Sequence, residues 1–157
     1  MPIIFRFDDS LDNTYSNAMP IMEEFGFKGV LNILPGYLGK EWHDVDPEGR
    51  DWGYREIMTL EEVMELSRLG WDIGSHSMNH RYFPELDIWK AVYESLCSFL
   101  WILVKVRKRP KTFAWPWGGE KFNRWIGLIY PYLMTIEEAI WDGRSKNVPV
   151  KNDYPPS

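Results

Sequence analysis

The chain has 157 residues, a length that suits one domain with a hydrophobic core and is short for two. It carries 18 Lys and Arg against 23 Asp and Glu, a formal net charge of −5. No run of five like charges occurs, so the electrostatic footprint of a nucleic-acid-binding protein is missing. The single cysteine, Cys97, excludes an intrachain disulfide and a thiolate zinc site. We therefore predict one domain spanning residues 1–157.

The sequence predicts neither a signal peptide nor a membrane span. Met1-Pro2 leads directly into a strand pattern, without a basic n-region or a cleavable apolar segment. The longest apolar run, Leu96 to Val104, is far below the roughly 20 residues that cross a bilayer. It is typical of a buried amphipathic helix, and the basic residues from Lys105 to Lys111 suit the end of that helix. We expect a cytoplasmic protein by default.

Strand and helix patterns alternate along the first part of the chain. We predict a buried strand at 2–7, a helix at 12–24 and a strand at 28–33. Asp12-Asn13 is expected to cap the helix, and its buried face is expected to comprise Ala18, Ile21, Met22 and Phe25. Residues 36–58 show no clear period. Their aromatic residues favour an ordered flap over a flexible tether.

The alternation continues to the end of the chain. Thr59 and Glu62 form a capping box for a helix expected to bury Leu60, Val63, Met64 and Leu66. The remaining predictions are a strand at 71–74, a helix at 84–107, a strand at 111–115, a helix at 118–129, a strand at 132–134, a second capping box at 135–138 and a loop at 143–157. Such alternation indicates βα units around a parallel sheet or barrel.

Polar or Gly/Pro-rich segments follow three of the predicted strands. They are Asp8-Asp9-Ser10, the segment from His76 to His80, and Trp115-Pro116-Trp117-Gly118. In folds built from βα units, the active site forms at the carboxyl ends of the parallel strands. We therefore expect these three segments to meet at one edge of the sheet.

The residue types in these segments suggest a metal-assisted reaction. His76 and His80 are four residues apart, and imidazoles at that spacing can converge on one ion where the chain turns. Two adjacent aspartates can divide the work, one on the metal and one free as a base. We interpret Asp9, His76 and His80 as ligands of a divalent metal, and Asp8 as the group that acts beside it.

Less specific explanations exist for each motif. The histidine spacing also arises by chance, and Asp pairs also cap helices. The third histidine, His43, has no partner at a ligand spacing, and we expect it to be a surface residue. Aromatic residues make up 16 % of the chain, with nine tryptophans. About half of these tryptophans are expected in the core, which leaves others to stack on sugar rings.

Three segments together resemble the polysaccharide deacetylases, carbohydrate esterases of family four with a distorted (β/α) barrel. Residues 5–10 (FRFDDS), 76–80 (HSMNH) and 113–118 (FAWPWG) match the order and spacing of the family's first three motifs. The histidine motif is the most specific, and the resemblance extends from about residue 3 to the end of the chain. It implies an α/β fold, a distorted or incomplete (β/α) barrel of the polysaccharide deacetylase type.

The resemblance also implies roles for individual residues. Asp9, His76 and His80 match the family's metal triad, which usually holds Zn²⁺ and sometimes another divalent ion. Asp8 matches the catalytic base. Trp117 matches the position whose backbone N–H helps to hold the oxyanion.

Three departures from the family pattern leave alternatives open. Ser10 stands where the first motif usually ends in Gly, and Ala114 where many members have an Arg that tunes the base. No histidine follows His80, although the family's late motif supplies one as a general acid. Another group replaces it, the chain stops before the last barrel strands, or the protein is a weakened or binding-only relative. A homo-oligomeric partner that covers an open edge near residues 135–157 is a further alternative.

The function implied is that of a metal-dependent hydrolase that removes acetyl groups, above all N-acetyl groups, from a GlcNAc-type polysaccharide or oligosaccharide. The expected partner is an acetylated glycan, with no nucleic acid and no membrane span. The alternatives are a non-catalytic carbohydrate-binding relative and a barrel that catalyses an unrelated amidohydrolase reaction.

Overall fold

The computed structural model describes residues 4–41, 45, 56–134, 139–141 and 148–149. Seven strands form one sheet in the order β1-β2-β3-β4-β5-β6-β7. The first five run parallel, and β6 and β7 continue the sheet antiparallel. The strands are β1 (Phe5–Phe7), β2 (Gly29–Ile33), β3 (Asp72–Ser75), β4 (Thr112–Ala114), β5 (Tyr132–Met134), β6 (Ala139–Trp141) and β7 (Val148–Pro149).

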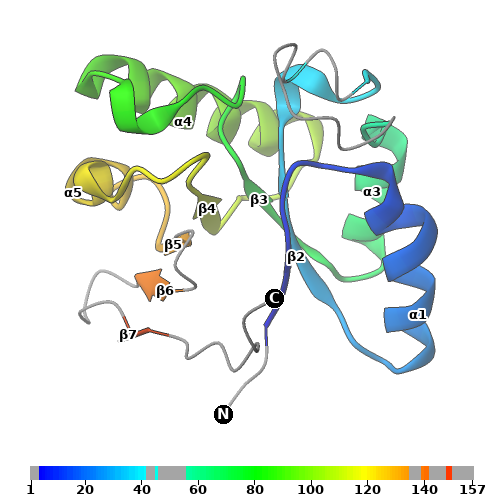
Figure 1. Cartoon of the computed structure of the whole chain (residues 1–157). Helices are drawn as coiled ribbons and strands as arrows, with labels where there is room; N and C mark the ends of the chain where they lie inside the picture. The colour runs from blue at the N-terminus through cyan, green and yellow to red at the C-terminus, as the bar shows by residue number, and fades with distance from the viewer. Residues whose placement is uncertain (1–3, 42–44, 46–55, 135–138, 142–147, 150–157) are drawn as a thin grey trace, which may run out of the picture.

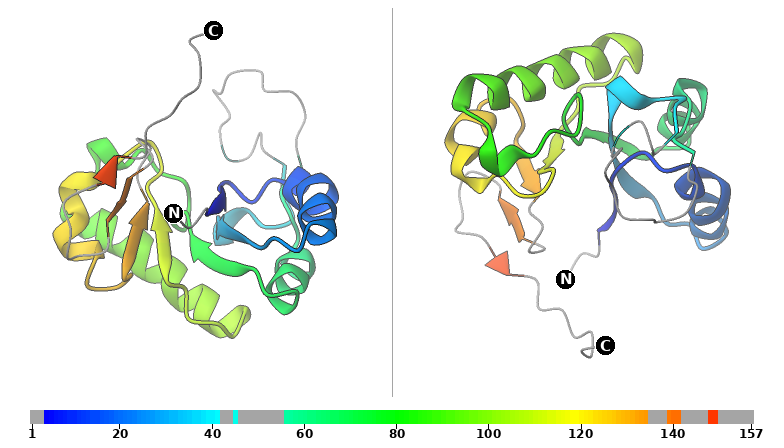
Figure 2. Two further views of the ribbon diagram at one scale, coloured as in Figure 1. Left: turned by 90° about the horizontal axis from the view of Figure 1, so that it is seen from below. Right: turned by 45° about the horizontal axis from the view of Figure 1, so that its top comes forward.

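Helices cover the outside of the curved parallel strands, which form half of a (β/α) barrel (Figure 1). The helices are α1 (Met19–Glu24), α3 (Leu60–Arg68), α4 (Ile88–Lys105) and α5 (Asn123–Ile126). Along this outer face, α1 and α3 lie together beside the first strands, and α4 and α5 lie beside the later ones (Figures 1 and 2). The predicted fold class, an incomplete (β/α) barrel with strands and helices in alternation, is confirmed. None of the described helices combines the length and apolarity that a membrane crossing requires.

Helix α3 forms where the capping box predicts it. The Thr59 hydroxyl accepts the Glu62 N–H at 3.3 Å, and the Glu62 carboxylate accepts the Thr59 N–H at 2.7 Å. Val63 and Leu66 are fully buried, whereas Leu60 and Met64 are half-buried. The helix therefore presents a narrower apolar face to the sheet than its pattern predicts.

The helical segment before β2 differs from the prediction. Its central residues, Thr14–Ala18, form a π-helical segment, and Asn13 makes no side-chain capping bond. Of the predicted buried face only Met22 is buried, while Ile21 and Phe25 are exposed. A π segment takes up extra residues per turn, so the following side chains point in directions that a regular 3.6-residue period does not predict.

Helix α4 begins at Ile88, four residues after the predicted start. Pro84 lies in a separate 3₁₀ turn (Phe83–Glu85), and Asp87 caps the helix by accepting the Lys90 N–H at 2.9 Å. The leucines of its apolar run are partly exposed, which corrects the expected burial of residues 96–104. Small and polar residues, Ala91, Ser95 and Ser98, occupy the buried side instead.

The remaining differences lie in the second half of the chain. The predicted helix at 118–129 is reduced to a 3₁₀ turn (Glu120–Phe122) and the four-residue α5. Residues 139–141, which follow the second capping box, form β6 and pair with β5. Strand β7 falls inside the predicted loop at 143–157. The capping box itself, most of that loop, and most of the predicted flap, including His43, lie outside the described residues.

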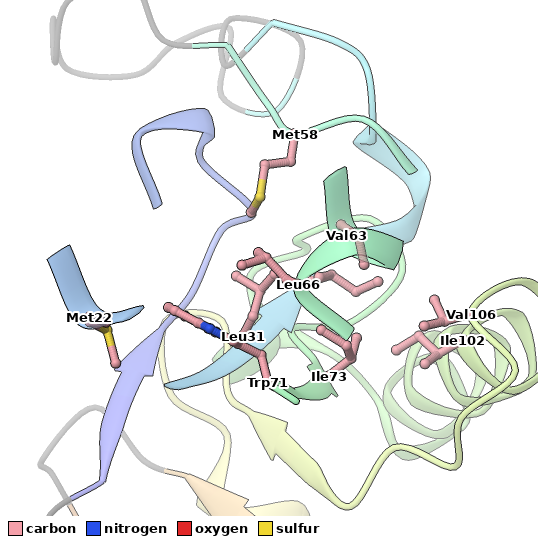
Figure 3. Packing of buried hydrophobic residues seen from close by; sticks show 10 residues of the cluster. Met22, Leu31, Met58, Val63, Leu66, Trp71, Ile73, Ile102 and Val106 are labelled. Atoms are coloured by element: carbon pink, nitrogen blue, oxygen red, sulfur yellow. The ribbon is translucent and has the colours of Figure 1, made fainter. Parts of the chain in front are cut away.

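Two hydrophobic clusters fill the space between sheet and helices. The first joins β2 and β3 to α3 and α4 and includes Leu31, Leu66 and Trp71 (Figure 3). The second is aromatic and surrounds Phe113 and Trp115. Strand β1 is only half-buried, and Phe5 is exposed, which corrects the expectation of a buried strand. Among the described residues β1 pairs with β2 alone, so its outer edge lacks the cover that a closed barrel would supply.

Candidate metal centre and active site

The loops after β1 and β3 bring Asp9, His76 and His80 together. The Asp9 Oδ1 atom lies 3.2 Å from the His76 Nε2 atom and 3.3 Å from the His80 Nε2 atom. One donor atom from each residue lies within 4.8 Å of the other two. The three side chains that the sequence predicts as ligands therefore converge on one point, and both imidazole side chains are almost fully buried.

The donor set fits a divalent cation. The Asp9 Oδ1 atom is buried, and no hydrogen-bond donor within the described part of the chain satisfies it. A buried carboxylate oxygen without a donor is unfavourable, because its interaction with water is lost and not replaced. A cation bound by this oxygen and two imidazoles would supply the missing interaction. Nitrogen and oxygen ligands of this kind suit Zn²⁺, and three protein ligands leave a coordination position open.

A hydrogen bond to the Ala114 carbonyl orients the His76 ring. The His76 Nδ1 atom lies 3.0 Å from the Ala114 carbonyl oxygen, so Nδ1–H donates to it and Nε2 keeps its lone pair for the site. Burial works to lower the pKa of His76, but the carboxylates of Asp8 and Asp9 raise it above the ordinary value. Burial works to raise the pKa of Asp9, and the two facing imidazoles lower it well below the usual range.

The loop that carries the histidines is held in an uncommon backbone conformation. Ser77 and His80 have φ values of 71° and 50°. Such left-handed conformations are unfavourable for residues with side chains and persist only where the surroundings impose them. Here the Ser77 hydroxyl accepts the His80 N–H at 3.0 Å, and the Ile33 carbonyl accepts the His76 N–H at 2.8 Å.

The loop after β1 explains one departure from the family pattern. Asp9 and Ser10 have φ values of 68° and 58°, a region that favours the Gly found in the first motif. The buried Ser10 is held there by its own contacts. Its hydroxyl accepts the Leu34 N–H at 2.8 Å, and its carbonyl accepts the Met58 N–H at 2.8 Å. The hydroxyl bond is one that glycine could not form, and together with the backbone bond it opposes the strain at Ser10.

Asp8 lies beside the ligand triad in a pocket of hydrogen-bond donors. The Arg6 Nε atom lies 3.0 Å and 2.8 Å from the two carboxylate oxygens, and Arg6 Nη2 also pairs with Oδ2. Asn32 Nδ2 donates to Oδ1 at 2.8 Å, and Thr112 donates to the Asn32 amide oxygen at 2.8 Å. Burial works to raise the pKa of Asp8. The charge of His76, with Arg6 and Asn32, lowers it below its ordinary value.

Arg6 and Asn32 are functional candidates that the sequence analysis missed. Arg6 was detectable, because alternate residues of a strand share a face and Arg6 precedes Asp8 by two positions. Ala114, which stands where many family members have an Arg, is fully buried and offers only its carbonyl, which binds His76. The guanidinium beside Asp8 therefore comes from β1 and not from the third motif.

An exposed aromatic pair borders the triad. The Trp117 ring centroid lies 5.6 Å from that of His80 and 6.4 Å from that of Tyr82. The exposed fractions of Trp117 and Tyr82 are 42 % and 50 %. Trp117 also has a positive φ of 61°, so the turn after β4 holds it in a fixed, uncommon conformation. Tyr82 was missed by the sequence analysis, although an aromatic residue two positions after His80 was a usable signal.

Comparisons with known proteins point to one family. The family model described as polysaccharide deacetylase matches residues 2–126. The poly-beta-1,6-N-acetyl-D-glucosamine N-deacetylase of Staphylococcus aureus is 22 % identical over 164 aligned residues, covering 95 % of this chain and 50 % of that protein.

Solved structures agree on the fold. The Streptococcus pyogenes deacetylase PplD, in complex with acetate, superposes with a TM-score of 0.70 at 21 % identity, covering 87 % of this chain and 57 % of that one. IcaB from Ammonifex degensii superposes with a TM-score of 0.71 at 16 % identity, covering 88 % and 62 %. At these identities the structures establish the fold alone. The chain spans half or less of the length of the first curated relatives it matches.

Proposed function

The chain belongs to the polysaccharide deacetylase family, and from that premise we propose that it is a metal-dependent hydrolase that removes N-acetyl groups from a GlcNAc-type glycan. The observation that carries the proposal is the unsatisfied Asp9 Oδ1 atom facing two histidine Nε2 atoms, with Asp8 alongside. Residues 1–157 are proposed to act as one domain of this type.

In this proposal Asp9, His76 and His80 hold a divalent metal, with Zn²⁺ as the first candidate. An amide is a poor electrophile, so its hydrolysis needs activation. The metal would supply it by polarising the amide carbonyl and acidifying a water molecule. Asp8 is ionised, since its pKa is lowered, and is the proposed acceptor of the proton from the attacking water. Arg6 and Asn32 fix the direction of that carboxylate. The Trp117 backbone N–H is the proposed donor to the developing oxyanion.

The glycan part of the proposal rests on the aromatic pair and on the relatives. Exposed Trp117 and Tyr82 rings beside His80 suit the apolar face of a sugar ring. The curated relative from S. aureus is named for poly-β-1,6-N-acetyl-D-glucosamine, and we propose the same substrate class here. The acetylated glycan is the proposed partner. The predicted homo-oligomer stays a prediction.

One observation favours a second candidate, a carbohydrate-binding relative without turnover. Residues 81–157 contain no histidine, so these residues do not supply the histidine of the family's late motif. Losing a general acid typically reduces the rate about 10²–10⁴-fold. The binding-only candidate explains this absence, but it leaves Asp8 and its three donors beside the metal triad without a function.

Acetate release is the measurement that separates the two candidates. The zinc-loaded protein is incubated with N-acetylated β-1,4-linked and β-1,6-linked glucosamine oligomers, with and without a chelator. We expect chelator-sensitive acetate release from at least one series. Oligomer binding by the metal-loaded protein without acetate release from either series would support the binding-only candidate and contradict the proposed activity.

A further inference from the structure

Glu94 is a buried carboxylate that the proposed chemistry does not use. It lies in the middle of α4, and its side chain is 2 % exposed. A buried carboxylate is unfavourable unless donors surround it. All of its described donors come from the segment that carries His80. The Asn79 N–H donates at 2.8 Å, Asn79 Nδ2 at 3.0 Å, and Arg81 Nε at 3.2 Å.

These contacts fasten the chain immediately before and after His80. Asn79 and Arg81 flank His80 in sequence, and both bind the same carboxylate. His80 adopts a φ of 50° between them, an unfavourable conformation for a residue with a side chain. Charge-assisted hydrogen bonds of this kind are about twice as strong as neutral ones, so Glu94 can impose that conformation.

The opposite side of the loop is fixed by Gly36. Its N–H donates to the Met78 carbonyl at 3.0 Å. A Cβ atom at Gly36 would lie 2.6 Å from the Met78 carbonyl oxygen and 2.7 Å from Asn79 Oδ1. Asn79 is therefore held between backbone on one side and Glu94 on the other. The loop has little freedom to move His80 away from Asp9.

We propose that Glu94 is a positioning residue that sets the affinity of the metal centre by holding the segment around His80 from helix α4. The inference rests on the metal site of the proposed function. It assigns Glu94 no contact with metal or substrate. Its effect is conformational, because without the carboxylate the His80 Nε2 atom is no longer held at the point where Asp9 and His76 converge.

The test is metal affinity, measured by competition titration with Zn²⁺, and the visible absorption spectrum of the Co²⁺-loaded protein. Glu94→Gln keeps the shape of the side chain and loses its charge. We expect about 10-fold weaker Zn²⁺ binding, at the lower end of the 10–100-fold range for residues that support metal ligands. The Co²⁺ spectrum should change, because the coordination geometry changes. Glu65→Gln is the matched control, since Glu65 is exposed on α3 and accepts a hydrogen bond from the Tyr15 hydroxyl.

Exchanging the side chains of Asn79 and Glu94 separates the positioning of the His80 segment from a general effect on stability. In Asn79→Asp with Glu94→Gln, amide and carboxylate change places and the net charge is restored. We expect Zn²⁺ affinity within about 3-fold of wild type, because most outer contacts of the ligand loop are re-formed. A double variant as weak as Glu94→Gln alone, or Glu94→Gln with wild-type affinity, overturns the inference.

A replacement variant and two results for the wild-type protein keep the test decisive. If Glu94→Gln does not fold, Asn79→Ala is measured in its place. That variant removes the hydrogen bond from Asn79 Nδ2 to Glu94 and keeps the one from the backbone N–H. Unchanged affinity and spectrum in that folded variant overturn the inference. Wild-type protein that binds Zn²⁺ without releasing acetate contradicts the proposed function and leaves this test intact. Wild-type protein that binds no Zn²⁺ overturns both.

Discussion

Asp8 and Asp9 are adjacent in sequence, yet the hydrogen bonding of their carboxylates differs. Asp8 lies with Arg6 and Asn32 in what we call the base pocket, and Asp9 lies with His76 and His80 in the candidate metal centre. In the base pocket both Asp8 oxygens accept hydrogen bonds, from Arg6 and Asn32. In the metal centre the Asp9 Oδ1 atom is buried and, within the described residues, has no donor. The hydrogen bonds of Asp8 are complete as they stand, whereas the Asp9 Oδ1 atom lacks a partner that the proposed cation would supply. Metal binding and orientation of the base should therefore be separable by mutation.

The largest effect is expected from removing a ligand. His80→Ala leaves Asp9 and His76 as the only protein ligands of the triad. We expect at least ~100-fold weaker Zn²⁺ binding, above the 10–100-fold cost of losing an outer partner, and loss of acetate release. Competition titration measures the affinity. His43→Ala is the matched control and should bind Zn²⁺ like wild type. Equal affinities in the two variants would show that His80 is not a ligand.

Protons and Zn²⁺ compete for His76, so Zn²⁺ affinity and the stability of the metal-free protein should depend on pH in opposite directions. The pKa of His76 is raised, so a proton stabilises the folded metal-free protein at low pH, and this contribution disappears as pH rises through that pKa. Zn²⁺ needs the deprotonated Nε2 atom, so its affinity has the opposite dependence. Below the His76 pKa we expect affinity to fall about 10-fold per pH unit. Titrations across pH 5–8, a range that spans roughly the ordinary His pKa, measure this. Constant affinity over that range would contradict the assignment of His76.

Arg6→Gln should damage the base pocket alone. It removes the guanidinium that binds both Asp8 oxygens while Asn32 keeps its contact. We expect kcat to fall about 10-fold through lost orientation, with Zn²⁺ affinity unchanged. Steady-state acetate release and metal titration give the two values, and Arg109→Gln, at an exposed position, is the control. A loss of metal affinity equal to the loss of kcat would show that the two regions are not separable.

The smallest effect on Zn²⁺ affinity and kcat is expected from a substitution that lowers only the stability of the fold. Thr59→Ala removes the cap of α3, which should lower the free energy of unfolding by about 1 kcal/mol. Below the unfolding transition, Zn²⁺ affinity and kcat should stay at wild-type values, because α3 supplies no described contact to either region. Chemical denaturation with and without Zn²⁺ gives the stability change. A shift in kcat at full folding would mean that stability and site geometry are coupled here.

The sequence predicts the parallel sheet and the ligand triad, because both depend on local pattern. Strand and helix periods alternate, and Asp9, His76 and His80 fall at strand ends that share one edge. The pairing of β6 with β5 was not predictable in this way, since it overrides the local capping signal before residue 139. Sheet pairing joins residues whose partners local pattern does not identify.

The supporting contacts were the least predictable part of the site. Asn32 reaches Asp8 from the next strand, and Glu94 reaches Asn79 from α4, across a separation in sequence that no period encodes. Helix α4 shows why. Its pattern places the leucines inside, but Ser98 is buried because it bonds Tyr130 at 3.0 Å. Polar side chains with partners can occupy buried positions that hydrophobicity alone assigns to apolar ones.

Acetate release by wild type and Asp8→Asn, at equal and measured Zn²⁺ occupancy, separates the proposed base from the proposed metal ligands. We expect both proteins to bind one Zn²⁺ with affinities within about 3-fold, because the ligand set is untouched. Acetate release by Asp8→Asn should fall about 10²–10⁴-fold, the usual cost of losing a general base. Asp8→Asn that releases acetate at the wild-type rate, or that loses Zn²⁺ together with activity, would contradict the division between base pocket and metal centre.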